Sequence, residues 1–332
     1  MYLRNNKPDE SSVLAQVAGS IRDVNDRVDL YLDQMGEHEI LNPFEQGVGA
    51  HSIAFREAVS RRFWESLGLR HIISNTSQGR LQIQEPWNIE KIDKDKFACI
   101  WDHLKNKVNI EELRTVISGS PIIGFADWAR TDDASNSWEG LLSDVIKPLK
   151  KRDFEFVFQL GDTEKKLVFE VDEFLDIVGD YSCYGRVTLI LDENEAGRLC
   201  SQLNGGDPDA PISDLKLNTL KDKCLFLFNT MSVGVLLILY SDRTLLITRE
   251  WQFEFAGRTL KNGNMSNDTK NCFSIGYQLG LLLHFDMPHC IALGLAVLGT
   301  YIEPVSKLDS KALLAYIDDW RSKSRLKTFF ET

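Results

Sequence analysis

The stretch that decides the fold is DFEFVFQLGDTEKKLVFEV, residues 153–171. Its first half alternates between apolar and other side chains, as a half-buried strand does, and this puts four apolar residues on one face: Phe154, Phe156, Phe158 and Leu160. GDTEK, residues 161–165, has the composition of a turn, and KLVFEV, residues 166–171, returns to apolar character. The stretch therefore predicts a β-hairpin with one aromatic face on the core.

Further apolar runs continue this pattern along the middle of the chain: VTLIL at 187–191, CLFLF at 224–228, VGVLLILY at 233–240 and TLLITREWQFEF at 244–255. Ser241-Asp242-Arg243 separates the last two runs by a tight turn, which is a hairpin signal. Because the expected strands come in adjacent pairs and helices between them are few, we predict an α+β fold. Its sheet is mixed and largely antiparallel, built from hairpins in the middle of the chain, with helical N-terminal and C-terminal regions.

The same patterns divide the chain at about residue 150. Residues 1–150 are expected to form a mainly helical region, and residues 151–332 an α+β region with C-terminal helices. Within the first region, residues 53–85 read as a helix followed by a hairpin, which is how a winged-helix module ends.

The composition limits the possible functions. The chain has 332 residues, 43% hydrophobic and 26% charged, and a net charge of −11. This is typical of a globular protein and argues against a surface that is basic all over, as a general nucleic-acid or membrane binder would have. The first residues, MYLRNNKPDESS, lack the apolar segment of a secretory signal, and the cysteines form no CxxC pair. We therefore expect a cytoplasmic protein with no membrane partner.

The N-terminal residues 11–35 carry apolar side chains at a spacing of three and four, which predicts a long amphipathic helix: Leu14, Val17, Ile21, Val24, Val28, Tyr31 and Met35. Such a stripe needs a helical partner. That partner is either another part of this chain or a second chain, so we expect protein binding or self-association through this helix as one of the two outcomes.

The helix and hairpin at 53–85 form the most basic stretch of this acidic chain. The candidate nucleic-acid-binding residues are its arginines: Arg56, Arg61, Arg62, Arg70 and Arg80. Arginines on a recognition helix and wing contact phosphates in known modules, and solvated arginines on a helix are also routine. A nucleic-acid partner is therefore an alternative expectation for this segment.

An acidic cluster follows the run VTLIL: Asp192, Glu193 and Glu195 lie in the sequence LDENEAGR. This sequence resembles the metal site of the Toprim family, in which a strand ends in D-x-D and an earlier strand ends in a glutamate followed by glycine. Glu139-Gly140 supplies the earlier pair, while Asn194 stands where the second aspartate would be. The resemblance implies a divalent-metal-dependent nuclease or hydrolase with Glu139 and Asp192 as catalytic residues.

A structural interpretation explains the same carboxylates. Asp192 is placed to cap the N-terminus of a helix, and Glu195, three residues later, is placed to complete a capping box. Asn204-Gly205-Gly206 would then end the helix. We prefer this interpretation, because it gives each carboxylate a role without a metal.

HFDMPHC, residues 284–290, is a second dense polar group, and His284, Asp286 and His289 are the candidate metal ligands. Asp286 followed by Pro288 is also how many helices begin. We therefore expect residues 284–290 to form either the start of a helix or a metal site.

No complete catalytic fingerprint is present: the sequence contains no GxSxG, GxxxxGK[ST] or HExxH motif. We expect no cofactor. The sequence-based hypothesis is a non-catalytic cytoplasmic interaction protein, acting as a subunit or adaptor of a larger assembly. The alternatives are nucleic-acid binding through residues 53–85 and a degenerate Toprim-like hydrolase.

Overall fold

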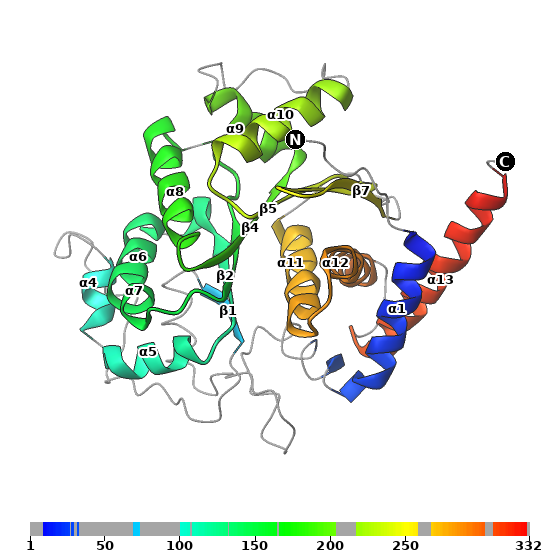
Figure 1. Cartoon of the computed structure of the whole chain (residues 1–332), viewed down its shortest axis with the longest axis horizontal. Helices are drawn as coiled ribbons and strands as arrows, with labels where there is room; N and C mark the ends of the chain where they lie inside the picture. Colours follow the sequence, from blue (N-terminus) through cyan, green and yellow to red (C-terminus); the bar gives the residue numbers. More distant parts are fainter. Residues whose placement is uncertain are drawn as a thin grey trace. The chain divides into compact units, whose positions relative to one another are not determined.

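A computed structural model describes residues 9–26, 28–29, 32, 69–73, 100–106, 108–131, 133–164, 166–203, 217–257, 267–302 and 308–330. Contacts group the chain into two compact units (Figure 1). One unit contains residues 39–235, and the other combines residues 1–38 with 236–332. Residues from both ends of the chain therefore belong to one unit, and the expected division at about residue 150 stays a prediction.

The described residues of the 39–235 unit contain four neighbouring strands in sequence order: β1 (Leu69–Ile73), β2 (Ile122–Asp127), β3 (Phe154–Gln159) and β4 (Gly185–Asp192). β1 pairs antiparallel with β2, whereas β2, β3 and β4 run parallel to one another. The fold is α+β with a mixed sheet, as expected, but the prediction of a largely antiparallel sheet built from hairpins is wrong. Parallel neighbours need helical crossovers, and the chain provides them.

The predicted hairpin at 153–171 shows why the prediction of an antiparallel sheet failed. Its first half forms β3, but its second half leads into α8 (Val168–Tyr181). The Leu167 backbone N–H donates to the Glu170 carboxylate at 2.8 Å, which supports the first turn. The buried side chains of α8 then recur at helical spacing: Val171, Phe174, Ile177, Val178 and Tyr181. A run of six apolar-rich residues fits the first two turns of such a helix as well as it fits a short strand.

The run CLFLF was also predicted as a strand, and it lies in α10 (Leu217–Thr230). β1, the described part of the segment expected as a helix and hairpin at 53–85, pairs with β2, some fifty residues later. The other residues of the expected helix and hairpin lie outside the described ranges.

Helices connect the strands of this unit: α4 (Ile100–Lys105), α5 (Ile110–Ser118), the 3₁₀ turn η2 (Trp128–Arg130), α6 (Ala134–Leu141), the π-turn η3 (Leu142–Ile146), α7 (Lys147–Leu149) and α8. The segment α6–α7 links β2 to β3, and α8 links β3 to β4. Right-handed crossovers between successive parallel strands place both connections on the same face of the sheet, as Figure 1 shows.

An aromatic cluster fills the space between this face and its helices. The Phe125 and Phe158 rings stack at 4.1 Å, and Trp138 of α6 contacts Phe125 at 4.8 Å between ring centres. The buried Tyr181 hydroxyl donates to the Trp138 carbonyl at 2.8 Å, and burial raises the pKa of this phenol well above its ordinary value. The aromatic residues at every other position of β3 therefore face the core, as the sequence predicts.

Beyond β4, α9 (Glu193–Leu203) packs with α10, and β5 (Val235–Leu239) begins where this unit ends. In the second unit, β6 (Arg243–Thr248) and β7 (Gln252–Ala256) form an antiparallel hairpin. The expected tight turn before β6 is present, since the Tyr240 N–H donates to the Arg243 carbonyl at 2.9 Å.

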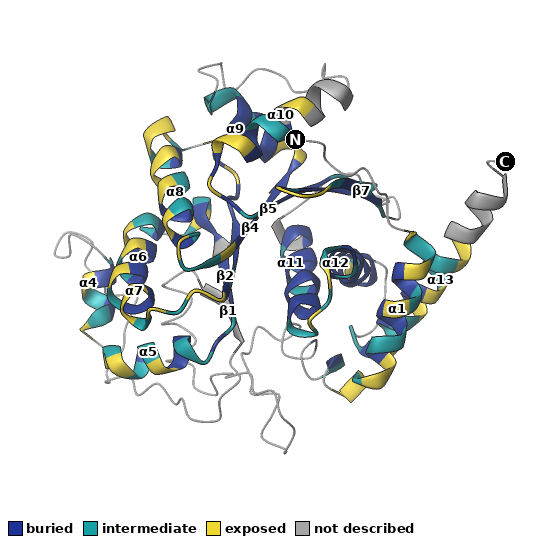
Figure 2. Ribbon diagram, viewed as in Figure 1, coloured by how far each residue is buried: buried dark blue, intermediate teal, exposed yellow. Residues whose placement is uncertain are grey.

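The described helices of the second unit include α1 (Glu10–Asp23), α11 (Asn267–Leu282), α12 (Met287–Ile302) and α13 (Ser310–Phe330). α12 is buried along most of its length (Figure 2). The apolar stripe of α1 packs against α12 and α13, and an Arg22–Asp318 ion pair of 3.1 Å joins α1 to α13. An intrachain partner thus covers the stripe along α1; association with another chain through residues 11–35 remains a prediction. No described helix is long and apolar enough to cross a membrane.

Candidate functional site

Three parallel strands end at the same edge of the sheet in the 39–235 unit. β2 ends at Asp127, β3 is followed by Gly161-Asp162-Thr163, and β4 ends at Asp192. Ligands in α/β sheets bind outside the carboxyl ends of parallel strands, because the loops that follow them are free to vary. We therefore take this carboxyl edge as the candidate functional site.

Asp127 and Gly161 form the floor of this edge. Asp127 is only 4% exposed, and Gly161 has a φ of +81°. A Cβ atom at residue 161 would lie 1.6 Å from Asp127 Oδ1, so only glycine allows this carboxylate to lie against the backbone that follows β3. The Ala129 N–H donates to the Leu160 carbonyl at 3.0 Å and ties the two segments together.

Two arginines flank the end of β3, each beside an aspartate. Arg130 follows β2; its side chain is 71% exposed, and its Nε lies 3.7 Å from Asp127 Oδ2. Arg198 lies on α9, and its Nη1 contacts Asp162 Oδ1. Because neighbouring strands are about 4.8 Å apart, the ends of β2 and β4 are about 10 Å apart. Two long arginine side chains can span that distance above the end of β3.

A third cation belongs to the same edge. Lys166 precedes α8, its ammonium group lies 4.7 Å from the centre of the Trp128 ring, and it is 3.6 Å from a Glu170 oxygen. Its backbone N–H donates to the Thr163 carbonyl at 2.9 Å, which fixes the loop after β3. Each of the three cations, on the segments after β2, β3 and β4, therefore lies beside a carboxylate.

Asp192 has the structural role that we preferred. Its backbone N–H donates to Glu195 Oε2, and the Glu195 N–H donates to Asp192 Oδ1, both at 2.9 Å. This is a capping box at the start of α9. Glu139 is exposed on α6, in a helix and not at the end of a strand. Within the described ranges, no group of three or more His, Cys, Asp or Glu side chains is placed to hold a metal.

The group at residues 284–290 is explained by two helix ends. His284 has a φ of +56° and closes α11: its N–H donates to the Leu281 carbonyl, and the Phe285 N–H donates to the Gly280 carbonyl, both at 3.0 Å. Asp286 caps α12 through the His289 N–H at 3.3 Å.

The imidazole of His289 contacts the Asp286 carboxylate through Nδ1, and its Nε2 lies 2.6 Å from Gln16 Oε1 of α1. The ring thus joins two helices of its own unit. Among the candidate metal ligands, the structure brings Asp286 and His289 together and gives His284 a backbone role.

The arginines proposed for nucleic-acid binding are not brought together in the described part of the chain. Arg70 lies in β1, and the structure describes its backbone pairing only. The other four lie outside the described residues: Arg56, Arg61, Arg62 and Arg80.

Four residues of the site were not among the sequence-based candidates: Arg130, Gly161, Lys166 and Arg198. Asp127, Gly161 and Arg130 each follow a short apolar run, which is a usable signal once the strands are known to be parallel. The hairpin interpretation of residues 153–171 hid that signal, because it placed Gly161 and Asp162 in an exposed turn.

Comparison with known proteins gives fold-level matches only. No family profile and no curated protein matches the chain. Adenosine kinase from Anopheles gambiae matches at 20% identity and a TM-score of 0.43, over 59% of this chain and 55% of that chain. Adenosine kinase from Trypanosoma brucei brucei matches at 13% identity and a TM-score of 0.45, over 60% and 58%. A putative sugar kinase from Clostridium perfringens matches at 13% identity and a TM-score of 0.44, over 63% and 58%. The chain thus spans less than two thirds of the length of these structures.

These findings correct the hypothesis of a non-catalytic interaction subunit or adaptor. The structures that match the chain are named as kinases, which are enzymes. The parallel strands β2–β4 also gather charged side chains at one edge, as ligand-binding α/β proteins do. The adaptor hypothesis is therefore wrong, and neither it nor its two alternatives is retained.

Proposed function

We propose that the chain is an enzyme that binds a small phosphate-bearing molecule at the carboxyl edge of β2, β3 and β4 and takes part in phosphoryl transfer. The observation that carries this proposal is the pair of arginines, Arg130 and Arg198, on either side of the end of β3. Guanidinium groups bind phosphate oxygens through two parallel N–H donors.

The aspartates prepare these arginines for a ligand. Asp127 is buried and lies 3.7 Å from Arg130 Nε, which leaves the outer N–H groups of this 71% exposed side chain toward solvent. Asp162, which is 55% exposed, contacts Nη1 of Arg198, whose own side chain is 28% exposed. A side chain that is already oriented loses less conformational freedom when it binds, so these contacts lower the conformational cost of binding an anion.

The cations also suit the chemistry. Phosphoryl transfer depends mainly on positioning and on stabilisation of negative charge on the transferred group. Arg130, Arg198 and Lys166 supply three positive charges from three successive strand-to-helix segments. In this proposal they hold the phosphates, and the loop Gly161-Asp162-Thr163 lies between them.

Binding of ATP and AMP, measured by isothermal titration calorimetry, tests the proposal. Arg130→Ala should weaken ATP binding about tenfold, which corresponds to ~1.4 kcal/mol. Arg152→Ala is the matched control, because Arg152 is exposed just before β3, at the opposite edge of the sheet. Equal affinities for the two variants, or no binding of either nucleotide by the unaltered chain, would overturn the proposal. Transfer to adenosine and to sugars is the first activity to assay, since these are the substrates named for the matched enzymes.

A further inference from the structure

The helical segment between β2 and β3 changes its winding near its end. α6 gives way to the π-turn η3 at Leu142, and α7 follows from Lys147. The Lys147 N–H donates to the Leu142 carbonyl, five residues back, instead of the usual four. One extra residue is therefore inserted into this turn of the helix.

Pro148 explains where the insertion lies. Proline has no backbone N–H, and within an α-helix its ring clashes with the carbonyl four residues earlier, which here belongs to Asp144. The wider π-turn removes this clash by turning the Asp144 carbonyl outward. That carbonyl then cannot receive the helical hydrogen bond that residue 148 would normally donate.

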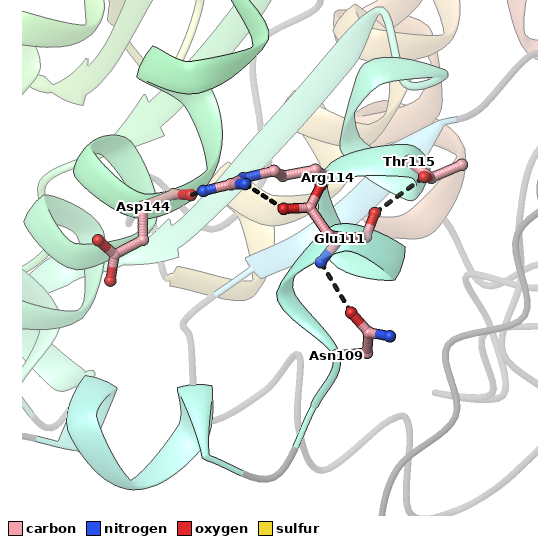
Figure 3. A network of polar contacts seen from close by, with 5 residues as sticks. All are labelled: Asn109, Glu111, Arg114, Thr115 and Asp144. Atoms are coloured by element: carbon pink, nitrogen blue, oxygen red, sulfur yellow. Dashed lines mark hydrogen bonds and ion pairs between the residues drawn. The ribbon is translucent and has the colours of Figure 1, made fainter.

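Arg114 of α5 supplies the missing donors. Its Nε lies 2.9 Å and its Nη2 2.7 Å from the Asp144 carbonyl oxygen (Figure 3). Glu111, one turn earlier on α5, contacts the other side of the guanidinium, and Asn109 caps the start of α5 through the Glu111 N–H at 2.9 Å. The guanidinium is thus held from its own helix and directed at one carbonyl of another.

Asp144 is also held through its side chain. The Trp101 indole N–H of α4 donates to Asp144 Oδ2 at 2.7 Å. Because α4 and α5 both contact this one residue, the π-turn is fixed by two elements outside its own helix. After the π-turn, Lys150 has a φ of +55°, and the chain continues from there to β3.

We propose that Arg114 acts as a latch on the one-residue insertion in the helix at 134–149. The inserted turn stays ordered only while the Arg114 guanidinium holds the Asp144 carbonyl. With the latch engaged, residues 142–150 keep the π-turn and deliver the chain to β3 in its observed register. With the latch removed, the Asp144 carbonyl loses both guanidinium donors, and Pro148 prevents the turn from closing into a regular α-helix. Residues 142–150 then open together.

Hydrogen exchange followed by mass spectrometry on peptides covering 142–150 tests this proposal. Arg114→Ala should speed exchange of these amides at least tenfold and leave β4 amides unchanged. Adding Pro148→Ala to this variant should restore slow exchange, because residue 148 then donates to the Asp144 carbonyl and the helix closes as an α-helix. Lys105→Ala, which removes a half-exposed cation of α4, is the control and should change nothing.

Two results would overturn the latch. One is unchanged exchange of residues 142–150 in Arg114→Ala. The other is equally fast exchange in Arg114→Ala with and without Pro148→Ala, because a guanidinium that merely packs on the helix would not be replaced by a backbone N–H. If Arg114→Ala fails to fold, Arg114→Lys carries the same comparison, since one ammonium donor replaces the two-donor contact only in part.

Discussion

Replacing Gly161 by alanine is the sharpest perturbation of the carboxyl edge. Two costs add. An L-residue at a φ of +81° loses about 1–2 kcal/mol, and a new Cβ placed 1.6 Å from Asp127 Oδ1 forces a buried carboxylate to move, at about 1–3 kcal/mol. Gly161→Ala should therefore lower the free energy of unfolding by about 2–5 kcal/mol, a large part of the stability of an ordinary domain.

The assay is urea unfolding followed by circular dichroism and tryptophan fluorescence. Repeating Gly161→Ala in an Asp127→Ala background separates the two costs, because the clash disappears and the backbone term of about 1–2 kcal/mol remains. Gly19→Ala in α1 is the control: a Cβ there meets no atom within 4 Å, and an alanine inside a helix should stabilise the protein by about 0.5–1 kcal/mol. A cost below about 1 kcal/mol for Gly161→Ala, or the same cost in both backgrounds, would refute the packing of Asp127 on residue 161.

Three further predictions concern the described helix ends and the sheet. Asp192→Ala and Glu195→Ala should each cost about 0.5–2 kcal/mol of unfolding free energy, and the double variant less than the sum, because the two side chains form one capping box; additive costs would contradict that. His284→Gly should raise the melting temperature and His284→Ala should not, since only glycine relieves the positive φ; equal effects would count against it. Burial raises the pKa of the Glu155 carboxyl above its ordinary value of 4.5, despite the contact with Arg186. Glu155 therefore contributes its full stabilisation of the folded chain below pH 4.5, and this stabilisation is lost as the pH rises through the pKa of the folded state. The unfolding free energy of the unaltered chain, minus that of Glu155→Gln, should therefore fall in urea titrations as the pH rises above 4.5; a constant or rising difference would contradict this pKa direction.

Local signals in the sequence were sufficient for several helix ends. The spacing of Asp192 and Glu195 predicted the capping box, and Asp286 before Pro288 predicted the start of α12. Both are short-range patterns in which the side chain and its backbone partner lie within one turn. Such pairings do not depend on the rest of the fold.

The direction of the strands depends on longer distances. Whether KLVFEV returns beside β3 or begins α8 is decided by the pairing of β3 with β4, some thirty residues later. β1 pairs with β2 at a still larger separation. The carboxyl edge could not be predicted from the sequence for this reason, since Asp127, Gly161 and Arg198 come together only once three strands are parallel.

The contact of Arg114 with Asp144 is a third kind of feature, one that the sequence predicts only in part. Pro148 alone predicts a disturbance four residues earlier, at Asp144. The sequence does not tell which side chain satisfies the carbonyl that the disturbance frees. Arg114 lies 30 residues from Asp144, and its role appears only when α5 is packed beside the π-turn.

The central claim is that the carboxyl edge of β2–β4 binds a phosphate-bearing ligand. Hydrogen exchange by the whole chain with and without ATP tests it most directly. The account predicts slower exchange in peptides covering 127–131, 160–164 and 192–199, with no change in peptides covering 110–120 and 150–154 at the opposite edge. Protection at that opposite edge, or no protection after β2, β3 and β4 when ATP is bound, would contradict it.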